Sequence, residues 1–123
     1  MKNYFKDARG EIRRFKINGT KFNLIYTKAG MLRSGDYHNS KQYDLILKGK
    51  FRITMLKKGK NVVMQKGANS LVEIPAKTPH LFEALKDSVM IEWWGGPFEA
   101  KYYAPYRKFV EASILKGKKR AKR

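Results

Sequence analysis

The sequence predicts an all-β barrel or sandwich that ends in a single α-helix. Glycine, asparagine or proline interrupts the chain roughly every 8 to 12 residues, and short runs rich in β-branched and aromatic residues lie between these turns. One of the turns is Asn18-Gly19, the dipeptide most typical of a tight β-hairpin. Only the C-terminal part shows helical spacing of its apolar residues. We therefore expect about eight or nine strands followed by one helix.

The strands can be assigned in order along the chain. The Asn18-Gly19 turn joins one predicted hairpin and the lysine-rich turn at 57–60 joins a second. The predicted strands cover residues 11–17, 21–28, 43–49, 51–56, 61–66, 70–75, 80–85 and 88–94. Pro75 and Pro79 confine the segment 74–80 to a loop or a strand edge.

The C-terminal segment predicts a helix at about residues 105–116. Phe109, Val110, Ile114 and Leu115 lie near the spacing of one helical face, between Pro105 and Gly117. We expect this helix to pack on the outside of a single barrel domain that covers residues 1–115. The basic residues 117–123 are predicted to form a disordered tail.

Composition restricts the class of protein. With 123 residues, 42% hydrophobic and 13% aromatic, the chain is long enough for one folded domain with a real core. The absence of cysteine excludes disulfides and thiolate metal sites and is compatible with a reducing cytoplasm, where we expect the protein. The N-terminal residues lack the apolar stretch of a signal peptide, and no apolar run is long enough to cross a bilayer, so we expect no membrane association.

The charge balance favours an anionic partner. The net charge is +18, from 28 basic and 10 acidic residues, and only six of the basic residues lie in the segment 116–123. The basic character therefore belongs to the domain as well as to its tail. Such a field attracts phosphorylated or carboxylated small molecules, nucleic acid or acidic surfaces. Because the sequence contains no known nucleic-acid-binding signature, we favour an anionic small molecule and keep nucleic acid as an alternative.

The two histidines of the chain lie in two turn-rich segments next to predicted strands. Alternate side chains of a strand share a face, so Asp36 and His38 point the same way if that segment is extended. After the following turn, Gln42 and then Asp44 would return to the same face. His80 begins another strand just after a proline turn. Two imidazoles, a carboxylate and an amide would then converge inside a barrel.

Two motifs resemble those of the cupin superfamily. The first motif consists of Gly30, five residues, Asp36-Tyr37-His38, three residues, Gln42, six residues and Gly49. The second reads as a proline turn followed by a histidine, at Pro75, Lys77 and His80. The resemblance implies a cupin-type double-stranded β-helix, or jelly-roll barrel, with a C-terminal α-helix.

The resemblance also implies a metal site. Carried over by position, the cupin ligand set is Asp36, His38, Gln42 and His80, and it would hold a divalent transition metal such as Fe, Mn, Ni or Zn. The set departs from the usual three histidines and one glutamate. An amide is a poor ligand, and Lys77 replaces a glycine of the second motif. Asp36 has a second interpretation as the cap of the Ser34-Gly35 turn.

The N-terminal part is similar to cupins that act on dTDP-linked sugars, the epimerases and ketoisomerases. The similarity rests on residues 5–15 and 29–38. It implies isomerisation or epimerisation of a nucleotide-linked or phosphorylated sugar by proton transfer. His38 would be the catalytic base and His80 a second catalytic proton carrier or a ligand. The first histidine of the ketoisomerase pair is Asp36 here, so that machinery does not transfer intact.

Further residues are candidates for substrate binding. Arg33 precedes the first motif and would contact a phosphate or carboxylate, although a solvated surface arginine is also consistent with its position. Asp36 and Gln42 would bind substrate polar groups, and Tyr26, Phe82 and Trp93 would line the cavity unless they pack in the core. The aromatic segments 93–98 and 102–107 suggest a subunit contact, and we expect a homodimer.

Three functions remain open on sequence grounds. The first is a small-molecule-binding protein with sugar isomerase or epimerase activity. The second is a metal-dependent cupin such as a dioxygenase. The third is a non-catalytic binder or sensor whose basic surface engages nucleic acid.

Overall fold

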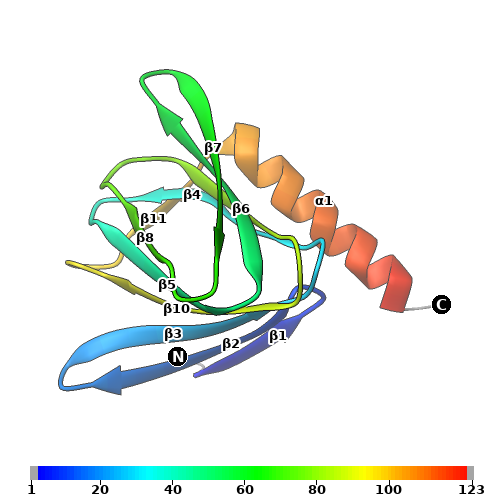
Figure 1. Cartoon of the computed structure of the whole chain (residues 1–123), viewed down its shortest axis with the longest axis horizontal. Helices are drawn as coiled ribbons and strands as arrows, with labels where there is room; N and C mark the ends of the chain where they lie inside the picture. The colour runs from blue at the N-terminus through cyan, green and yellow to red at the C-terminus, as the bar shows by residue number, and fades with distance from the viewer. Residues whose placement is uncertain (1–2, 122–123) are drawn as a thin grey trace.

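The computed structural model describes residues 3–121 and shows two antiparallel sheets that face each other, with a helix outside them (Figure 1). Within this range the elements are β1 (Tyr4–Asp7), β2 (Gly10–Ile17), β3 (Thr20–Thr27), β4 (Leu32–His38), β5 (Gln42–Lys48), β6 (Lys50–Lys57), β7 (Lys60–Gly67), β8 (Leu71–Ile74), β9 (His80–Ala84), β10 (Ser88–Trp94), β11 (Ala100–Tyr102) and α1 (Ala104–Ala121). The predicted all-β fold with a C-terminal helix is confirmed. The short strands β1 and β11 were not predicted, and β4 was not among the predicted strands, although Asp36 and His38 were placed on one face on the condition that their segment is extended.

The two sheets have the strand orders β1-β2-β3-β10-β5-β8 and β11-β4-β9-β6-β7. Both predicted hairpins are present, as β2–β3 and β6–β7. At the first turn, Asn18 and Gly19 have φ values of 48° and 81°, the left-handed conformation that a two-residue hairpin turn requires. The second turn meets the same requirement with Lys58 and Gly59.

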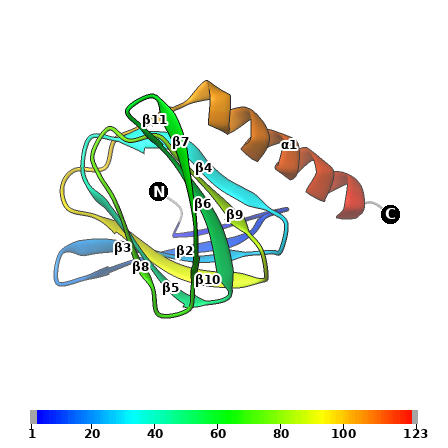
Figure 2. The ribbon, with the colours of Figure 1, turned by 45° about the horizontal axis from the view of Figure 1, so that its top comes forward.

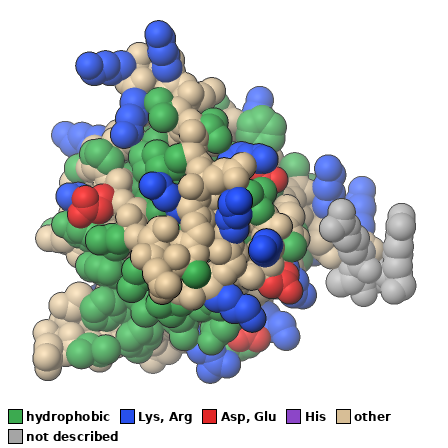
Figure 3. All heavy atoms as spheres, in the orientation of Figure 1, with side chains coloured by type: hydrophobic (Ala, Val, Ile, Leu, Met, Phe, Trp, Pro, Cys, Tyr) green, Lys and Arg blue, Asp and Glu red, His purple; other side chains and the backbone are tan. Residues whose placement is uncertain are grey.

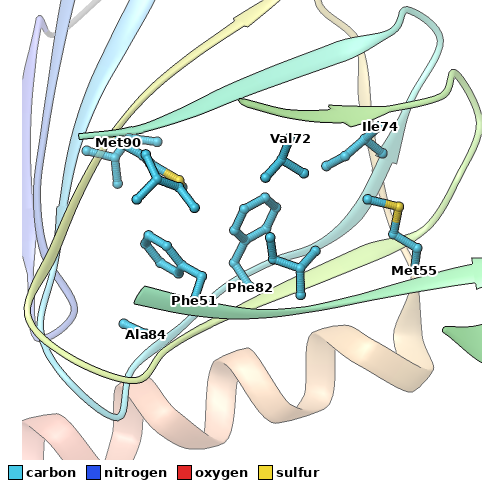
Figure 4. Close-up of a cluster of buried hydrophobic side chains, with 10 residues drawn as sticks. Phe51, Met55, Val72, Ile74, Phe82, Ala84 and Met90 are labelled. Atoms are coloured by element: carbon cyan, nitrogen blue, oxygen red, sulfur yellow. The ribbon is translucent and has the colours of Figure 1, made fainter. Parts of the chain in front are cut away.

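The core lies between the sheets, where alternate residues of each strand point inward. Figure 4 shows this cluster, which consists of Ile25, Ile46, Phe51, Ile53, Met55, Val72, Ile74, Phe82, Ala84 and Met90. The same alternation carries buried polar side chains into the interior from β5 and β10, namely Gln42, Asp44 and Glu92. The barrel therefore has both an apolar and a polar interior region.

A β-bulge in β4 sets the direction of the residues that follow it. The pairing of β4 with β9 shifts between Ser34 and Asp36, and Ser34 and Gly35 have positive φ values of 76° and 71°. Arg33 pairs with Phe82 before the bulge, and Asp36 pairs with His80 after it. Without the extra residue, alternation would place Arg33 and Asp36 on opposite faces. The bulge turns both side chains toward the interior.

Helix α1 packs against β4 and β9 on the outside of the barrel (Figure 2). Its buried residues are Tyr106, Val110 and Ser113, whereas Phe109 and Leu115 are exposed. Phe109, Val110, Ile114 and Leu115 were expected to form the buried face of the helix. Phe109 and Leu115 lie outside the buried face, so that expectation is corrected for these two residues. No helix in the described part of the chain has the length and apolarity to span a membrane.

The helix continues to Ala121, beyond its predicted end near residue 116 and into the segment predicted as a disordered tail. Gly117, expected to stop the helix, lies inside it. A Cβ at this position would approach the Ala8 Cβ to 2.7 Å, so the glycine permits close packing of the helix against Ala8. Lysine and alanine then continue the helix favourably. Residues 122–123 of the predicted tail lie outside the described residues.

Candidate functional site

Asp36, His38 and His80 meet at the neighbouring ends of β4 and β9. Nε2 of His38 lies 3.4 Å from Oδ1 of Asp36, and Nε2 of His80 lies 3.3 Å from the same oxygen. One ligand atom from each residue falls within 4.8 Å of the others. Strand alternation placed Asp36 and His38 on one face, and the motif resemblance added His80; the structure brings the three side chains together.

The orientation of His80 is set by a backbone contact. Its Nδ1 lies 2.9 Å from the Thr78 carbonyl oxygen, an acceptor, so Nδ1 carries the proton and Nε2 keeps its lone pair. The ring is fully buried, and this burial lowers the pKa of His80 below its usual value. A neutral imidazole with Nε2 directed at a carboxylate is the form that binds a metal ion.

The hydrogen-bond pattern of the three side chains fits a cation. Oδ1 of Asp36 and Nε2 of His80 are buried, and neither has a hydrogen-bond partner among the described residues. Buried polar atoms are nearly always paired, so two unpaired atoms facing each other at 3.3 Å point to a shared ligand. Two imidazole nitrogens and one carboxylate oxygen suit Fe, Mn, Ni or Zn and leave coordination positions open.

Gln42, expected as a fourth ligand, is held through its amide nitrogen, whereas its Oε1 has no hydrogen-bond partner among the described residues. Its Nε2 donates hydrogen bonds to Oδ2 of Asp44 at 2.6 Å and to Oε2 of Glu92 at 2.9 Å. It therefore joins two carboxyl groups that lie opposite each other on β5 and β10. Burial, together with the neighbouring Glu92, raises the pKa of Asp44 well above its usual range, and burial raises that of Glu92. Sequence reasoning placed Asp44 on this face and missed Glu92.

A cavity of about 590 Å³ opens beside the three candidate ligands. Asp36 and His38 line it, whereas His80 is fully buried and is not one of its lining residues. Four arginines line the same cavity, namely Arg9, Arg14, Arg33 and Arg107. Glu92 and the aromatic side chains Phe5, Trp94, Phe98 and Tyr102 complete much of the wall. The excess of guanidinium groups makes the cavity suited to an anionic ligand with an apolar part.

Arg33 is the most deeply buried of these arginines, with 4% of its surface exposed. Its Nε donates to Thr27 Oγ1 at 2.6 Å and its Nη2 donates to the Tyr26 carbonyl at 2.9 Å. Within the described residues no carboxylate forms an ion pair with it. Burial, and after it the neighbouring Arg9, lowers the pKa of Arg33 to about 10, so the group is still charged at neutral pH. A buried, charged guanidinium held only by neutral acceptors is available to an anion.

Helix α1 contributes Arg107, which sequence reasoning did not select. Its Nη1 donates to the Ser34 carbonyl at 2.9 Å, and its guanidinium lies 4.3 Å from the centre of the Tyr102 ring. The contact anchors the start of the helix to the bulge in β4. Arg9 was missed in the same way, and it is held by Asp7 at 2.8 Å. Both arginines lie far from the two motifs in sequence, so only the fold reveals their position.

Tyr26, Phe82 and Trp93, expected to line the cavity, lie elsewhere. Phe82 is fully buried in the core. Tyr26 and Trp93 point outward, because their inward-facing neighbours on β3 and β10 are Ile25 and Glu92. Trp94 takes the place expected for Trp93, since a shift of one residue along a strand reverses the face. Lys77 adopts the positive φ of the glycine it replaces, and its side chain is exposed, away from the site.

Comparisons with known proteins identify the fold. No protein-family model matches the chain, and no curated protein is similar to it in sequence. Among solved structures, Bacillus subtilis oxalate decarboxylase aligns with a TM-score of 0.67 and 17% identity, over 74% of this chain and 26% of that one. The capsular polysaccharide assembling protein CapF from Staphylococcus aureus aligns with a TM-score of 0.66 and 20% identity, over 80% of this chain and 31% of that one. Both of these proteins have the cupin fold.

The chain has the cupin fold. The predicted jelly-roll barrel is thereby confirmed. The chain spans about a quarter to a third of the length of these matched structures. In this barrel His38 and His80 lie on the neighbouring strands β4 and β9.

Proposed function

We propose that this cupin binds a divalent transition metal through Asp36, His38 and His80 and, beside it, a small organic anion. The observation that supports the proposal is that two features of the structure occur side by side. The three ligand atoms converge without hydrogen bonds among themselves, and two of the three residues form part of the wall of an arginine-lined cavity.

The similarity to known structures supports the metal. Bacillus subtilis oxalate decarboxylase has Mn(II) centers, and its cupin fold aligns with most of this chain. Mn, Fe, Ni and Zn all accept imidazole and carboxylate ligands, and the donor set alone does not choose among them. When bound, the metal would supply a Lewis-acid centre for an oxygen of the ligand.

The residues of the chain itself would position the anion. Arg33 would bind one carboxylate or phosphate group, because its guanidinium is fixed in place by Thr27 and the Tyr26 carbonyl. Arg107 would form a second positive contact from the side of α1. Trp94 and Phe98, whose ring centres are 4.6 Å apart, would pack against the apolar part of the ligand and exclude water from it.

Sugar isomerisation or epimerisation, expected from the sequence, is a second candidate function. It is favoured by one observation, the placement of His38 beside Asp36 in the cavity wall. In this case His38 would act as the base that moves a proton next to a carbonyl, and Asp36 would orient it. This alternative needs no metal, so metal binding separates the two proposals.

We propose in addition that the protein acts in the cytoplasm as a homodimer. The absence of cysteine suits a reducing compartment. The exposed apolar side chains Tyr26 and Leu47 on the six-stranded sheet support the dimer.

The metal proposal is tested by titrating the full chain with MnCl₂ and measuring the heat of binding by calorimetry. We expect one Mn²⁺ per chain, and affinity at least about tenfold lower in Asp36→Asn and in His80→Ala. The matched control is Glu73→Gln, which removes an exposed carboxylate on β8 and should leave the affinity unchanged. Absence of binding by the wild type, or equal losses in Asp36→Asn and Glu73→Gln, would refute the metal site. Hydrogen exchange of a bound dTDP-sugar in heavy water, lost in His38→Ala, would then support the second candidate.

A further inference from the structure

Two β-hairpins of the barrel each carry two lysines directly opposite one another near the turn. In β2–β3, Lys16 pairs with Lys21, and in β6–β7, Lys57 pairs with Lys60. All four residues are exposed, and none of them forms an ion pair within residues 3–121. Like charges directly opposite each other destabilise a pair of strands. Two such pairs therefore point to a surface that meets negative charge from outside the chain.

The first lysine pair lies on the cavity side of β2–β3. Arg14 and Asn23 pair with each other, and both of them line the cavity. Lys16 and Lys21 are two residues further along their strands, and a step of two residues keeps the same face. The lysine pair therefore lies about 7 Å beyond these lining residues, toward the turn of the hairpin.

The second lysine pair lies on the other sheet, at the same end of the barrel. Lys57 follows Met55 by two residues, and Met55 pairs with His80 of the candidate metal site. Figure 1 shows the turns of the two hairpins projecting on opposite sides of the barrel. Basic side chains lie at the top of Figure 3, where Figure 1 places the turn of β6–β7. The two hairpins therefore flank the end of the barrel that holds the candidate site.

Helix α1 connects the second hairpin to the cavity wall. The Tyr106 hydroxyl donates a hydrogen bond to Oδ1 of Asn61, the residue that follows Lys60. Arg107, next to Tyr106, lines the cavity, and its guanidinium carbon lies 4.3 Å from the centre of the Tyr102 ring. These contacts hold the turn of β6–β7 beside the mouth of the cavity.

A fifth exposed lysine lies beside the candidate metal site. The backbone nitrogen of Lys77 donates a hydrogen bond to the His38 carbonyl at 2.6 Å, which places this lysine next to a residue that lines the cavity. In the part of the chain that the structure describes, Lys77 also has no ion-pair partner. We call these five lysines the basic rim: Lys16, Lys21, Lys57, Lys60 and Lys77.

Exposed aromatic side chains line the cavity mouth next to the basic rim. Phe98 and Tyr102 are 62% and 67% exposed, and Phe5 is 43% exposed, although all three line the cavity. Phe98 and Tyr102 belong to the segments that we expected at a subunit contact. Lysines beside solvent-facing rings are suited to single-stranded nucleic acid, because the lysines contact phosphates and every base has a face that stacks on a ring.

We propose that the basic rim and these aromatic side chains bind single-stranded nucleic acid across the mouth of the cavity. Nucleic acid, an alternative partner on sequence grounds, thereby has a surface. A duplex keeps its bases stacked on each other, so the exposed rings would have no base face to contact. A lipid surface fits less well, because the turn positions Asn18-Gly19 and Lys58-Gly59 carry no apolar side chain that would enter a bilayer. The proposal goes beyond the metal and small-anion site, whose described residues include none of the rim lysines.

Fluorescence anisotropy of a labelled oligo(dT) of about 12 nucleotides, titrated with the full chain, tests this surface. With one phosphate contact for each of the four paired lysines, log Kd should rise with log salt concentration with a slope of about 2.8, which is an affinity loss of about 50-fold between about 50 and 200 mM NaCl. Lys16→Gln/Lys21→Gln and Lys57→Gln/Lys60→Gln should each lower this slope by about 1.4, because each removes two contacts. Tyr102→Leu should weaken binding about fivefold or more through lost stacking.

The matched control is Lys48→Gln/Lys50→Gln, which removes two exposed lysines at the opposite ends of β5 and β6 and should leave the slope unchanged. No binding by the wild type at about 50 mM NaCl, or the same loss of slope in the control as in the rim variants, would overturn the proposal. Equal or tighter binding of the matching dT·dA duplex would overturn it as well.

A membrane partner and a failed metal site give different results. Sedimentation with phosphatidylserine vesicles that is lost in both rim variants, and that oligo(dT) does not compete away, would assign the rim to a lipid surface and overturn the proposal. Circular dichroism identifies a variant that is unfolded. Both rim variants should still bind Mn²⁺ as the wild type does, so failure of the nucleic-acid surface and failure of the metal site are distinguishable.

Discussion

Replacing Gly35 by alanine should destabilise both the barrel and the cavity. Gly35 occupies the bulge of β4 with a φ of 71°, and it lies against the first turn of α1. A Cβ at this position would approach the Arg107 Cα to 2.7 Å and the Arg107 nitrogen to 2.9 Å. Both are backbone atoms, so no side-chain rotation relieves the contact. The helix would have to move away from the strand.

The expected size of the effect has two parts. The left-handed conformation costs about 1–2 kcal/mol for a residue with a Cβ. Overpacking against rigid neighbours adds about 1–3 kcal/mol. The sum is about 2–5 kcal/mol. The entropy of unfolding for a chain of this length is about 0.26 kcal/mol/K, so Tm should fall by about 8–19 °C.

The matched control is Gly59→Ala in the β6–β7 turn. Gly59 has nearly the same φ, 74°, but no atom lies within 4 Å of an added Cβ. This variant should lose only about 1–2 kcal/mol, or about 4–8 °C in a thermal melt followed by circular dichroism. Equal losses in the two variants would refute close packing of α1 on the bulge. Because Arg107 moves with the helix, Gly35→Ala should also weaken binding of anions, measured with succinate as a probe.

Three further outcomes are expected. Asp44→Asn should raise the free energy of unfolding at pH 8 by about 1–3 kcal/mol in urea melts. The raised pKa values of Asp44 and Glu92 make the folded state bind a proton more tightly than the unfolded chain. The stability contributed by this proton is complete below the unfolded pKa values near pH 4 and is lost as pH rises through the folded pKa values. We therefore expect little gain in the free energy of unfolding from Asp44→Asn at pH 4, and an equal gain at pH 4 and pH 8 would contradict the prediction. Tyr106→Phe should cost about 1 kcal/mol, because it removes the hydrogen bond that the hydroxyl donates to Asn61, and an unchanged Tm would contradict this. Arg33→Lys should lower succinate affinity about tenfold by calorimetry while Mn²⁺ affinity stays constant, and a parallel loss of both would argue against a separate anion contact.

The sequence predicted the parts of the site that depend on local spacing. Asn18-Gly19 marked the first hairpin because that turn requires two left-handed residues in succession. Asp36 and His38 could be placed on one face by strand alternation alone, and His80 by the proline turn before it. These features each depend on a few consecutive residues, so the printed sequence is sufficient to recognise them.

The residues that were missed depend on register and on distant contacts. The bulge at Ser34 and Gly35 changes which residues share a face with Arg33. The sequence indicates a turn at these two residues, but it does not show the shift in strand register. Trp93 and Trp94 are adjacent, and only the pairing of β10 with β5 decides which one faces the cavity. Arg107 reaches the cavity because α1 packs on β4, a contact between segments about 70 residues apart.

The polar interior of the barrel contains two clusters of side chains, and each of them includes buried atoms without a hydrogen-bond partner among the described residues. Gln42 Nε2 ties Asp44 and Glu92 together, and burial favours a proton on that pair. Oδ1 of Asp36 and Nε2 of His80 have no such partner, although both are buried. Leaving buried polar atoms unpaired costs about 1–3 kcal/mol for each, and a cation bound by both removes that cost. Because such a cation would bind the folded state alone, the stability of the protein should increase with the cation concentration, by about 2.7 kcal/mol at 100 times the Kd. The same burial that makes the site unfavourable by itself would then make metal binding and folding a single coupled equilibrium.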